Sequence, residues 1–170
     1  MTSDSKATIS GSFLSGLILS VAVFFAPVPV VAQVTAFKQA VSEAASRDKD
    51  IAAFYQSNGY KPVWTGSGEA DRNRRAELLR AIEGAASHGL PVARYDPAAL
   101  MATLQAVRSP RDRGLAEVEM SRVFLQYARD IQTGVLIPKR VDSAIVRDVP
   151  YRDRTAYLTG LVDAKPASFF

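Results

Sequence analysis

The sequence contains no cysteine among its 170 residues and only one histidine, His88. Without cysteine there is no disulfide framework, no thiolate zinc site and no thiol nucleophile. No second strong metal ligand stands near His88 at motif spacing, and no nucleophile accompanies it as a general base would require. We therefore predict no catalytic residue, no metal site and no cofactor. One residue before Gly89, His88 is better placed to interact with a helix C-terminal dipole.

Blocks of like charge are also missing. The chain has 21 basic and 17 acidic residues, a net charge of +4, and no run of five like charges. This balance argues against a dedicated nucleic-acid-binding protein and favours loose contact with anionic polymers such as cell wall. The densest basic stretch comprises Arg72, Arg74, Arg75 and Arg80. It has two interpretations, namely contact with an anionic wall polymer or an ordinary solvated helix face, and we expect the solvated face.

Only one long apolar run is present, Phe13–Ala26. Small residues follow it at Val30 and Ala32, the −3 and −1 positions of a signal-peptidase site before Gln33. We predict that residues 1–32 are a signal peptide and that the exported mature chain has no transmembrane span. An uncleaved anchor is the alternative, but the run is shorter than the ~20 apolar residues that a bilayer span needs.

The mature chain shows helical periodicity almost throughout. Residues 33–170 suffice for one domain, and the absence of cysteine leaves its apolar core to hold it together. The expected helices are Phe37–Asn58 with a left-handed cap at Gly59, a helix from the N-cap Asp71 to Gly89, a helix starting at Asp96-Pro97, Leu115–Thr133 ending at Gly134, and Arg152–Ala164. We expect an all-α fold, a small bundle of four to five amphipathic helices.

The segments between the expected helices contain residues that predict their conformation. Pro62 forces the segment before Trp64 to be extended, and a loop follows to Ala70. We expect a second loop at residues 109–114, and Pro138 should prevent the helix that ends at Thr133 from resuming. Ile145, Val146 and Val149 are candidates for a short extended piece.

Aromatic and turn-forming residues are concentrated in three blocks at the ends of the expected helices. The first block carries Phe54, Tyr55, Gly59, Tyr60, Pro62 and Trp64; the second carries His88, Gly89, Leu90 and Tyr95; the third carries Phe124, Tyr127, Asp130, Gly134 and Pro138. In this order they resemble the scaffold domain of the large periplasmic murein L,D-transpeptidases of bacteria. The resemblance covers about residues 50–166, nearly all of the predicted mature chain.

The resemblance implies a function in peptidoglycan synthesis. In such enzymes a separate catalytic domain uses a cysteine thiolate to take an acyl group from a tetrapeptide stem and pass it to a meso-diaminopimelate amine, giving a 3→3 cross-link. Since this sequence has no cysteine, none of those catalytic residues can be assigned here. The resemblance therefore implies a non-catalytic periplasmic scaffold, with peptidoglycan and the catalytic domain as partners. Because Phe169 and Phe170 should pack onto something, we expect a chain that is truncated at its C-terminus.

Two alternatives remain. One is a free-standing periplasmic protein that binds peptidoglycan or a partner enzyme, for which Tyr60, Trp64, Arg74 and Arg75 are the candidate contacts. Tyr60 and Trp64, together with Tyr55, would stack on sugar rings, but we favour the interpretation that they close the core around a helix end. The other is a glycan hydrolase using Asp96 and Asp130, but Asp96 already has an N-cap role and we expect Asp130 on the polar side of its helix.

Overall fold

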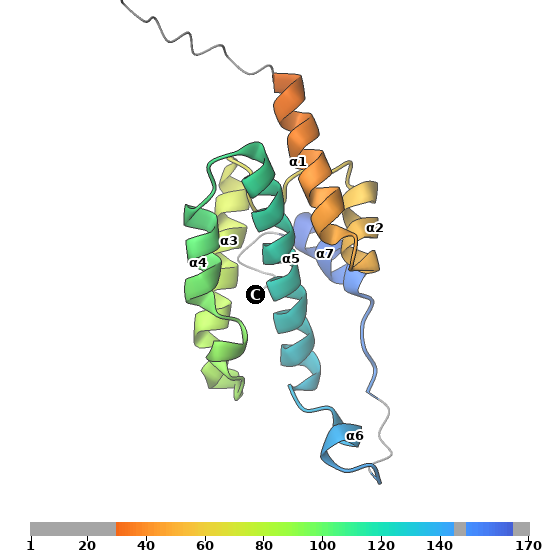
Figure 1. Cartoon of the computed structure of the whole chain (residues 1–170). Coiled ribbons are helices and arrows are strands. Elements are labelled where there is room, and N and C mark those ends of the chain that lie inside the picture. The colour runs from red at the N-terminus through yellow and green to blue at the C-terminus, as the bar shows by residue number, and fades with distance from the viewer. Residues whose placement is uncertain (1–29, 145–148, 165–170) are drawn as a thin grey trace, which may run out of the picture.

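The structure is a computed structural model that describes residues 30–144 and 149–164. Within these ranges every regular element is helical (Figure 1). The α-helices are α1 (Val30–Ala45), α2 (Lys49–Ser57), α3 (Glu69–Glu83), α4 (Pro97–Gln105), α5 (Pro110–Thr133), α6 (Pro138–Val141) and α7 (Arg154–Asp163), and two 3₁₀ turns are η1 (Gly84–His88) and η2 (Val92–Arg94). The all-α prediction is confirmed, while the expected count of four to five helices is too low.

Helix α5 is the central element. It has 24 residues and packs against α1, α2, α4 and α7. Figure 1 shows α3 and α4 on one side of it and α1, α2 and α7 on the other. The largest fully buried side chains come from all of these layers: Tyr55, Trp64, Ile51, Leu78, Ile82, Met120, Phe124, Leu158 and Leu161. One apolar core therefore extends on both sides of α5.

The expected single helix over Phe37–Asn58 is wrong, because α1 ends at Ala45 and α2 begins at Lys49. Asp48 makes the break: its backbone is extended and its Oδ1 accepts from the backbone N–H groups of Asp50 (3.2 Å) and Ile51 (3.3 Å). An aspartate N-cap inside a continuous apolar periodicity starts a new helix, although the periodicity itself gives no sign of the break.

The start of α5 was also predicted too late, at Leu115. Ser109 and Asp112 form a capping box in which each side chain accepts from the other's backbone N–H, and Pro110 occupies the first turn. The segment expected to be a loop is therefore the first turn of the longest helix. Aspartate in place of the usual glutamate or glutamine at the third position hid this signature.

The second expected helix is divided differently. It starts at Glu69 rather than after Asp71, and its α-helical part ends at Glu83 before continuing as η1. Gly89 ends η1 in the left-handed conformation (φ 71°), as its position in the sequence predicted.

Several other boundaries agree with the sequence. Asp96 caps α4 by accepting from the Ala99 N–H at 3.0 Å, Gly134 ends α5, and α7 lies within the expected Arg152–Ala164. The helix that ends at Thr133 does not resume at once, as predicted, and Pro138 instead occupies the first turn of the short separate helix α6, where its missing N–H costs nothing.

Some predictions fall wholly or partly outside the described residues. Only Val30–Ala32 of the predicted signal peptide are described, and they lie in the first turn of α1. Ile145 and Val146 also lie outside, and Val149 belongs to no regular element. In the described part of the chain, no helix is both long and apolar enough to cross a bilayer.

Candidate functional site

The first sequence block is attached to α5 through two of its buried aromatic side chains, Tyr55 and Trp64. Trp64 Nε1 donates to Ser121 Oγ at 2.9 Å, and the Tyr55 hydroxyl lies 2.8 Å from the same oxygen. The Trp64 ring also packs on Phe124, with 5.6 Å between ring centroids. Both Trp64 and Tyr55 have no exposed surface, so they close the core and neither forms a platform for sugar rings. The candidate partner contact at Trp64 is corrected accordingly.

Glu117 holds the segment around Trp64 by its carboxylate, which has no exposed surface. It accepts from three successive backbone N–H groups, those of Val63 (2.5 Å), Trp64 (3.1 Å) and Thr65 (2.8 Å). The hydroxyls of Tyr55 (2.9 Å) and Thr65 (2.6 Å) donate to it as well. Burial and the negative charge of Glu117 raise the pKa of Tyr55 well above its ordinary value, which keeps this donor protonated.

The carbonyl groups of the same segment are bound by two arginines of α3. Arg74 donates to the Val63 carbonyl at 2.5 Å and to Asp71 Oδ1 at 2.7 Å. Arg75 donates to the carbonyls of Trp64 and Gly66. The expectation of a solvated basic face is therefore wrong for Arg74, which is buried, and both arginines satisfy backbone carbonyls of an extended segment that no strand pairs with.

The second and third blocks meet at Asp130. Its Oδ2 accepts from Arg94 Nε at 2.6 Å and from the Tyr95 hydroxyl at 3.1 Å, and the rings of Tyr95 and Tyr127 pack edge to face at 5.5 Å. Asp130 is only 1% exposed, so the expected surface position is wrong. Burial and the neighbouring Asp130 charge raise the pKa of Tyr95, so its hydroxyl remains a donor at neutral pH.

The remaining block residues serve as turns. Gly59 has a positive φ (65°), and the Tyr60 N–H donates back to the Tyr55 carbonyl at 2.8 Å, which confirms the predicted cap. Tyr60 is itself left-handed (φ 58°) and half-buried against the core. The other turn and packing residues are Phe54, Pro62, Gly89, Leu90, Gly134 and Pro138. With these turns in place, the three blocks form one framework attached to α5, which we call the α5 framework.

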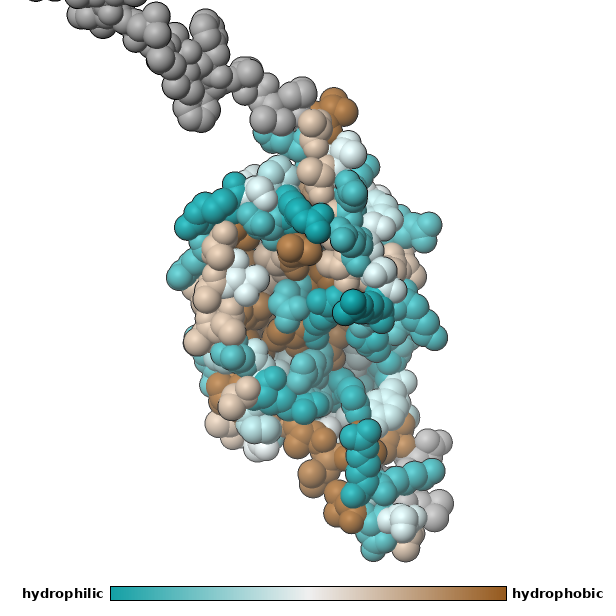
Figure 2. All heavy atoms as spheres, in the orientation of Figure 1, coloured by the Kyte–Doolittle hydropathy of each residue, from teal (hydrophilic) through white to brown (hydrophobic). Residues whose placement is uncertain are grey.

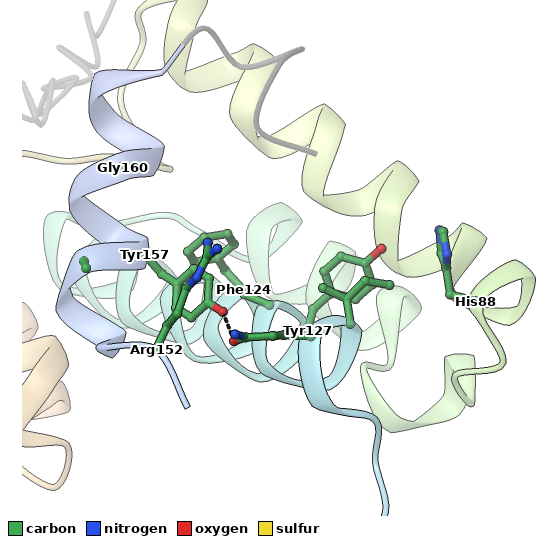
Figure 3. A pocket seen from close by; sticks show the side chains of 10 residues that line it. His88, Phe124, Tyr127, Arg152, Tyr157 and Gly160 are labelled. Atoms are coloured by element: carbon green, nitrogen blue, oxygen red, sulfur yellow. Dashed lines mark hydrogen bonds between the residues drawn. The ribbon is translucent and has the colours of Figure 1, made fainter. Parts of the chain in front are cut away.

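Beside this framework lies a groove between α5 and α7, with a volume of about 540 Å³. Two block residues on α5, Phe124 and Tyr127, lie on its floor, together with Ala128, Ile131 and Gln132; the walls are formed by His88 of η1, Arg152 before α7, and Ala156, Tyr157 and Gly160 of α7. Figure 3 shows His88 at one end, Arg152 and Tyr157 at the other, and Tyr127 between them. We call this the α5–α7 groove.

A second cavity of about 300 Å³ adjoins the α5–α7 groove and shares Gln132, Arg152 and Tyr157 with it. Its further lining residues are Leu125, Arg129, Tyr151 and Arg154. We call this cavity the arginine end of the groove. Among the described residues no carboxylate lines either cavity, whereas three arginines line the arginine end. The Tyr157 hydroxyl donates to Gln132 Oε1 and so ties α7 to α5 at this point.

Hydrophobic surface gathers where α5 leads into α6 (Figure 2). Leu136 and Val141 are 70% and 63% exposed there, and Ile131 connects this surface to the α5–α7 groove. We call these three residues the apolar tip. Exposed apolar patches of this kind are typical of protein–protein contact.

The sequence indicated the aromatic members of the α5 framework but missed Glu117, Ser121 and Arg94. A signal was available for two of them: Glu117 and Ser121 stand at helical spacing with Met120 and Phe124, on the buried face of α5. Arg94 lies 36 residues from Asp130, and no local pattern connects the two.

The described residues contain no group of three or more histidine, cysteine, aspartate or glutamate side chains arranged to hold a metal ion. Asp96 and Asp130, the pair considered for glycan hydrolysis, are both engaged, Asp96 with the Ala99 N–H and Asp130 with Arg94 and Tyr95. The described arrangement can therefore hold segments in place and present surfaces.

Comparison with known proteins gives one match. A family model described as "Scaffold domain" matches residues 49–170, which include all three sequence blocks and the α5–α7 groove. Neither a curated protein nor a solved structure matches the chain. The matched region is the same one that resembles the scaffold domain of the L,D-transpeptidases, and the chain belongs to the scaffold-domain family.

Proposed function

We propose that this chain is the non-catalytic scaffold module of a peptidoglycan L,D-transpeptidase, in the cell-wall system that forms 3→3 cross-links. The observation that carries the proposal is the meeting of the three sequence blocks on α5. Tyr55 and Trp64 bind Ser121, and Arg94 and Tyr95 bind Asp130, so the residues that resemble the family motif build one rigid framework. The family match over the same residues supports it.

The proposed role is positional. A cross-linking enzyme must bring together two peptide stems on large polymers, and fixed geometry lowers the entropic cost of that encounter. The reacting thiolate would belong to a separate catalytic domain, since this chain has no cysteine. Its own contribution is a helical body that holds the catalytic and wall-binding parts at a set distance, after export to the periplasm through residues 1–32.

Two accessible surfaces suit such contacts. The apolar tip offers Leu136 and Val141 to a partner domain, and the α5–α7 groove offers aromatic and basic side chains. By contrast, Trp64 and Arg74 are buried and unavailable. Of the four residues first considered for contact, Tyr60 and Arg75 are half-buried, and Arg75 is already bound to the carbonyls of Trp64 and Gly66.

Cell fractionation with an antibody against the described residues tests the proposal. The immunoreactive protein should be periplasmic, should be larger than the 18.4 kDa of this chain, and should carry a cysteine that reacts with a thiol label. A protein that is confined to the cytoplasm, or a larger one that carries no reactive cysteine, would contradict the scaffold proposal.

The groove favours a second candidate, a free-standing periplasmic protein that binds the wall. Here the immunoreactive product would have the mass of residues 33–170. It would sediment with purified sacculi at a salt concentration that removes weak surface binding. Failure to sediment, at the same small mass, would exclude this candidate.

A further inference from the structure

The charges at the arginine end of the α5–α7 groove are not balanced within the groove. Arg154 is neutralised outside it, because its Nη2 lies 2.6 Å from Asp48 Oδ2 and its Nη1 lies 2.9 Å from Asp50 Oδ2. Arg129 and Arg152 form no ion pair with any described residue, and no described carboxylate lines the two cavities. Two guanidinium groups there are consequently free to bind an anion.

The volume and aromatic lining of the arginine end suit a small ligand. The two adjoining cavities have volumes of about 540 and 300 Å³, within the range of about 300–1,000 Å³ typical of small-ligand sites. Arg129 is held in place by stacking, with its guanidinium carbon 5.1 Å from the centroid of the Tyr151 ring. Its Nε is buried and has no hydrogen-bond partner among the described residues.

Further along the groove the lining becomes apolar. Tyr127 lies between the arginine end and His88 (Figure 3), and Phe124, Ala128 and Ile131 line the same groove. A ligand that matches both parts carries a carboxylate at one end and an uncharged, partly apolar body behind it. A peptide with a free carboxylate meets both requirements, because guanidinium groups bind carboxylates in bidentate geometry.

We infer that the arginine end binds a carboxylate of a peptidoglycan stem peptide, with the remainder of the peptide along the α5–α7 groove. The inference rests on the proposed function for its choice of peptide. Arg152 makes the direct contact, because it is exposed and lines both cavities. Arg129 supplies the second guanidinium from α5, and Arg154 positions the segment before α7 through Asp48 and Asp50.

A calorimetric titration of the purified chain with a disaccharide tetrapeptide tests the inference. The muropeptide with free carboxylates should bind at least tenfold more tightly than the same muropeptide with its carboxylates amidated. Arg152→Gln should lower the affinity for the free acid about tenfold and leave the amidated ligand unaffected, which is the effect of losing one charge-assisted contact.

The matched control is Arg80→Gln, which removes an equal charge from an arginine that is 72% exposed on α3 and outside both cavities. It should leave the affinity unchanged. Both variants should melt close to the wild-type temperature, because Arg152 forms no hydrogen bond with a described residue and the ion pair of Arg80 with Glu77 lies at the surface, where such a pair contributes little. Equal binding of the acid and amidated ligands would assign the groove to an uncharged occupant and overturn the inference. Full affinity in Arg152→Gln would overturn it as well, while leaving the periplasmic scaffold proposal to its own fractionation test.

Discussion

A buried carboxylate without a neighbouring cation is costly unless hydrogen bonds replace its lost hydration. Glu117 forms no ion pair within the described residues, but it accepts from three backbone N–H groups and two hydroxyls. It therefore performs for the segment Val63–Thr65 the task that a neighbouring strand performs in a sheet. At the scale of single residues, this carboxylate is the main link between the first block and α5.

Replacing Glu117 by glutamine tests that role. Glutamine keeps the volume but loses the charge and places an N–H₂ group among donors, so some N–H groups of Val63–Thr65 lose their acceptor. The unfolding free energy, measured by urea denaturation, should fall by at least about 2 kcal/mol, the scale of a buried hydrogen bond to a charged group. Glu119→Gln is the control: its pair with Arg122 is exposed, and the loss should stay below about 0.5 kcal/mol. Equal losses in both variants would contradict the role of Glu117.

The positions of single residues could be predicted from the sequence where a residue type has one dominant structural role. Gly59, Gly89 and Gly134 were placed correctly at left-handed or terminal positions, because few other residues adopt a positive φ. Asp130 was misplaced because a charged residue is normally exposed, and its partners, Arg94 and Tyr95, belong to a distant segment.

At the scale of elements, the packing of α1 on α5 depends on Gly114. A Cβ added at Gly114 would lie 2.7 Å from Ala40 Cβ and 2.9 Å from the Phe37 carbonyl oxygen, so the two helices would have to separate. Gly114→Ala should destabilise the domain by about 1–3 kcal/mol despite the better helix propensity of alanine. Gly84→Ala, where nothing lies within 4 Å, should be neutral or slightly stabilising in the same denaturation experiment. A stabilised Gly114→Ala variant would show that α1 and α5 do not pack this closely.

The contact between α7 and α2 should depend on pH, because it includes the ion pairs of Arg154 with Asp48 and Asp50. Burial acts to raise the pKa of Asp48, but the hydrogen bond and charge of Arg154, with the N–H groups of Ile51 and Asp50, hold that pKa below 3.8. A carboxyl group whose pKa is lowered by folding stabilises the fold above its unfolded pKa, and this contribution disappears as the pH falls through the folded pKa. Arg154→Gln should therefore lower the melting temperature near pH 7, and the difference from wild type should shrink as the pH falls through the folded pKa of Asp48.

Melting curves of wild type and Arg154→Gln between pH 7 and pH 2 provide the measurement. Arg111→Gln serves as the reference, because the Arg111–Glu43 pair is exposed on both sides and should matter little at any pH. A gap between wild type and Arg154→Gln that persists unchanged below the pKa of Asp48 would contradict the assignment.

Element boundaries were the weakest part of the sequence prediction. The apolar pattern runs on past Asp48, so the cap between α1 and α2 was not separated from an ordinary surface aspartate. In the same way Ser109-Pro110 was interpreted as a loop, although both residues are typical of a helix start. In both cases the capping residues were present in the sequence. Which of the possible caps forms depends on tertiary partners, such as Arg154 for the cap Asp48.

At the scale of the whole molecule, helical periodicity and the three blocks were sufficient to predict an all-α scaffold domain. The α5–α7 groove was not predictable, because His88, Tyr127 and Arg152 belong to segments that only tertiary packing brings together. Its arginine end likewise depends on Asp48 and Asp50 neutralising Arg154 from another helix. The framework can therefore be inferred from local pattern, whereas the surface available to a partner cannot.

We propose that this chain positions cell-wall components and performs no chemistry on them. Incubating the purified chain with isolated sacculi, followed by chromatography and mass spectrometry of the muropeptides, tests this proposal. We predict that the muropeptide profile is identical before and after incubation. New 3→3 cross-linked dimers, or shortened glycan strands, would contradict the claim and place a catalytic site within these 170 residues.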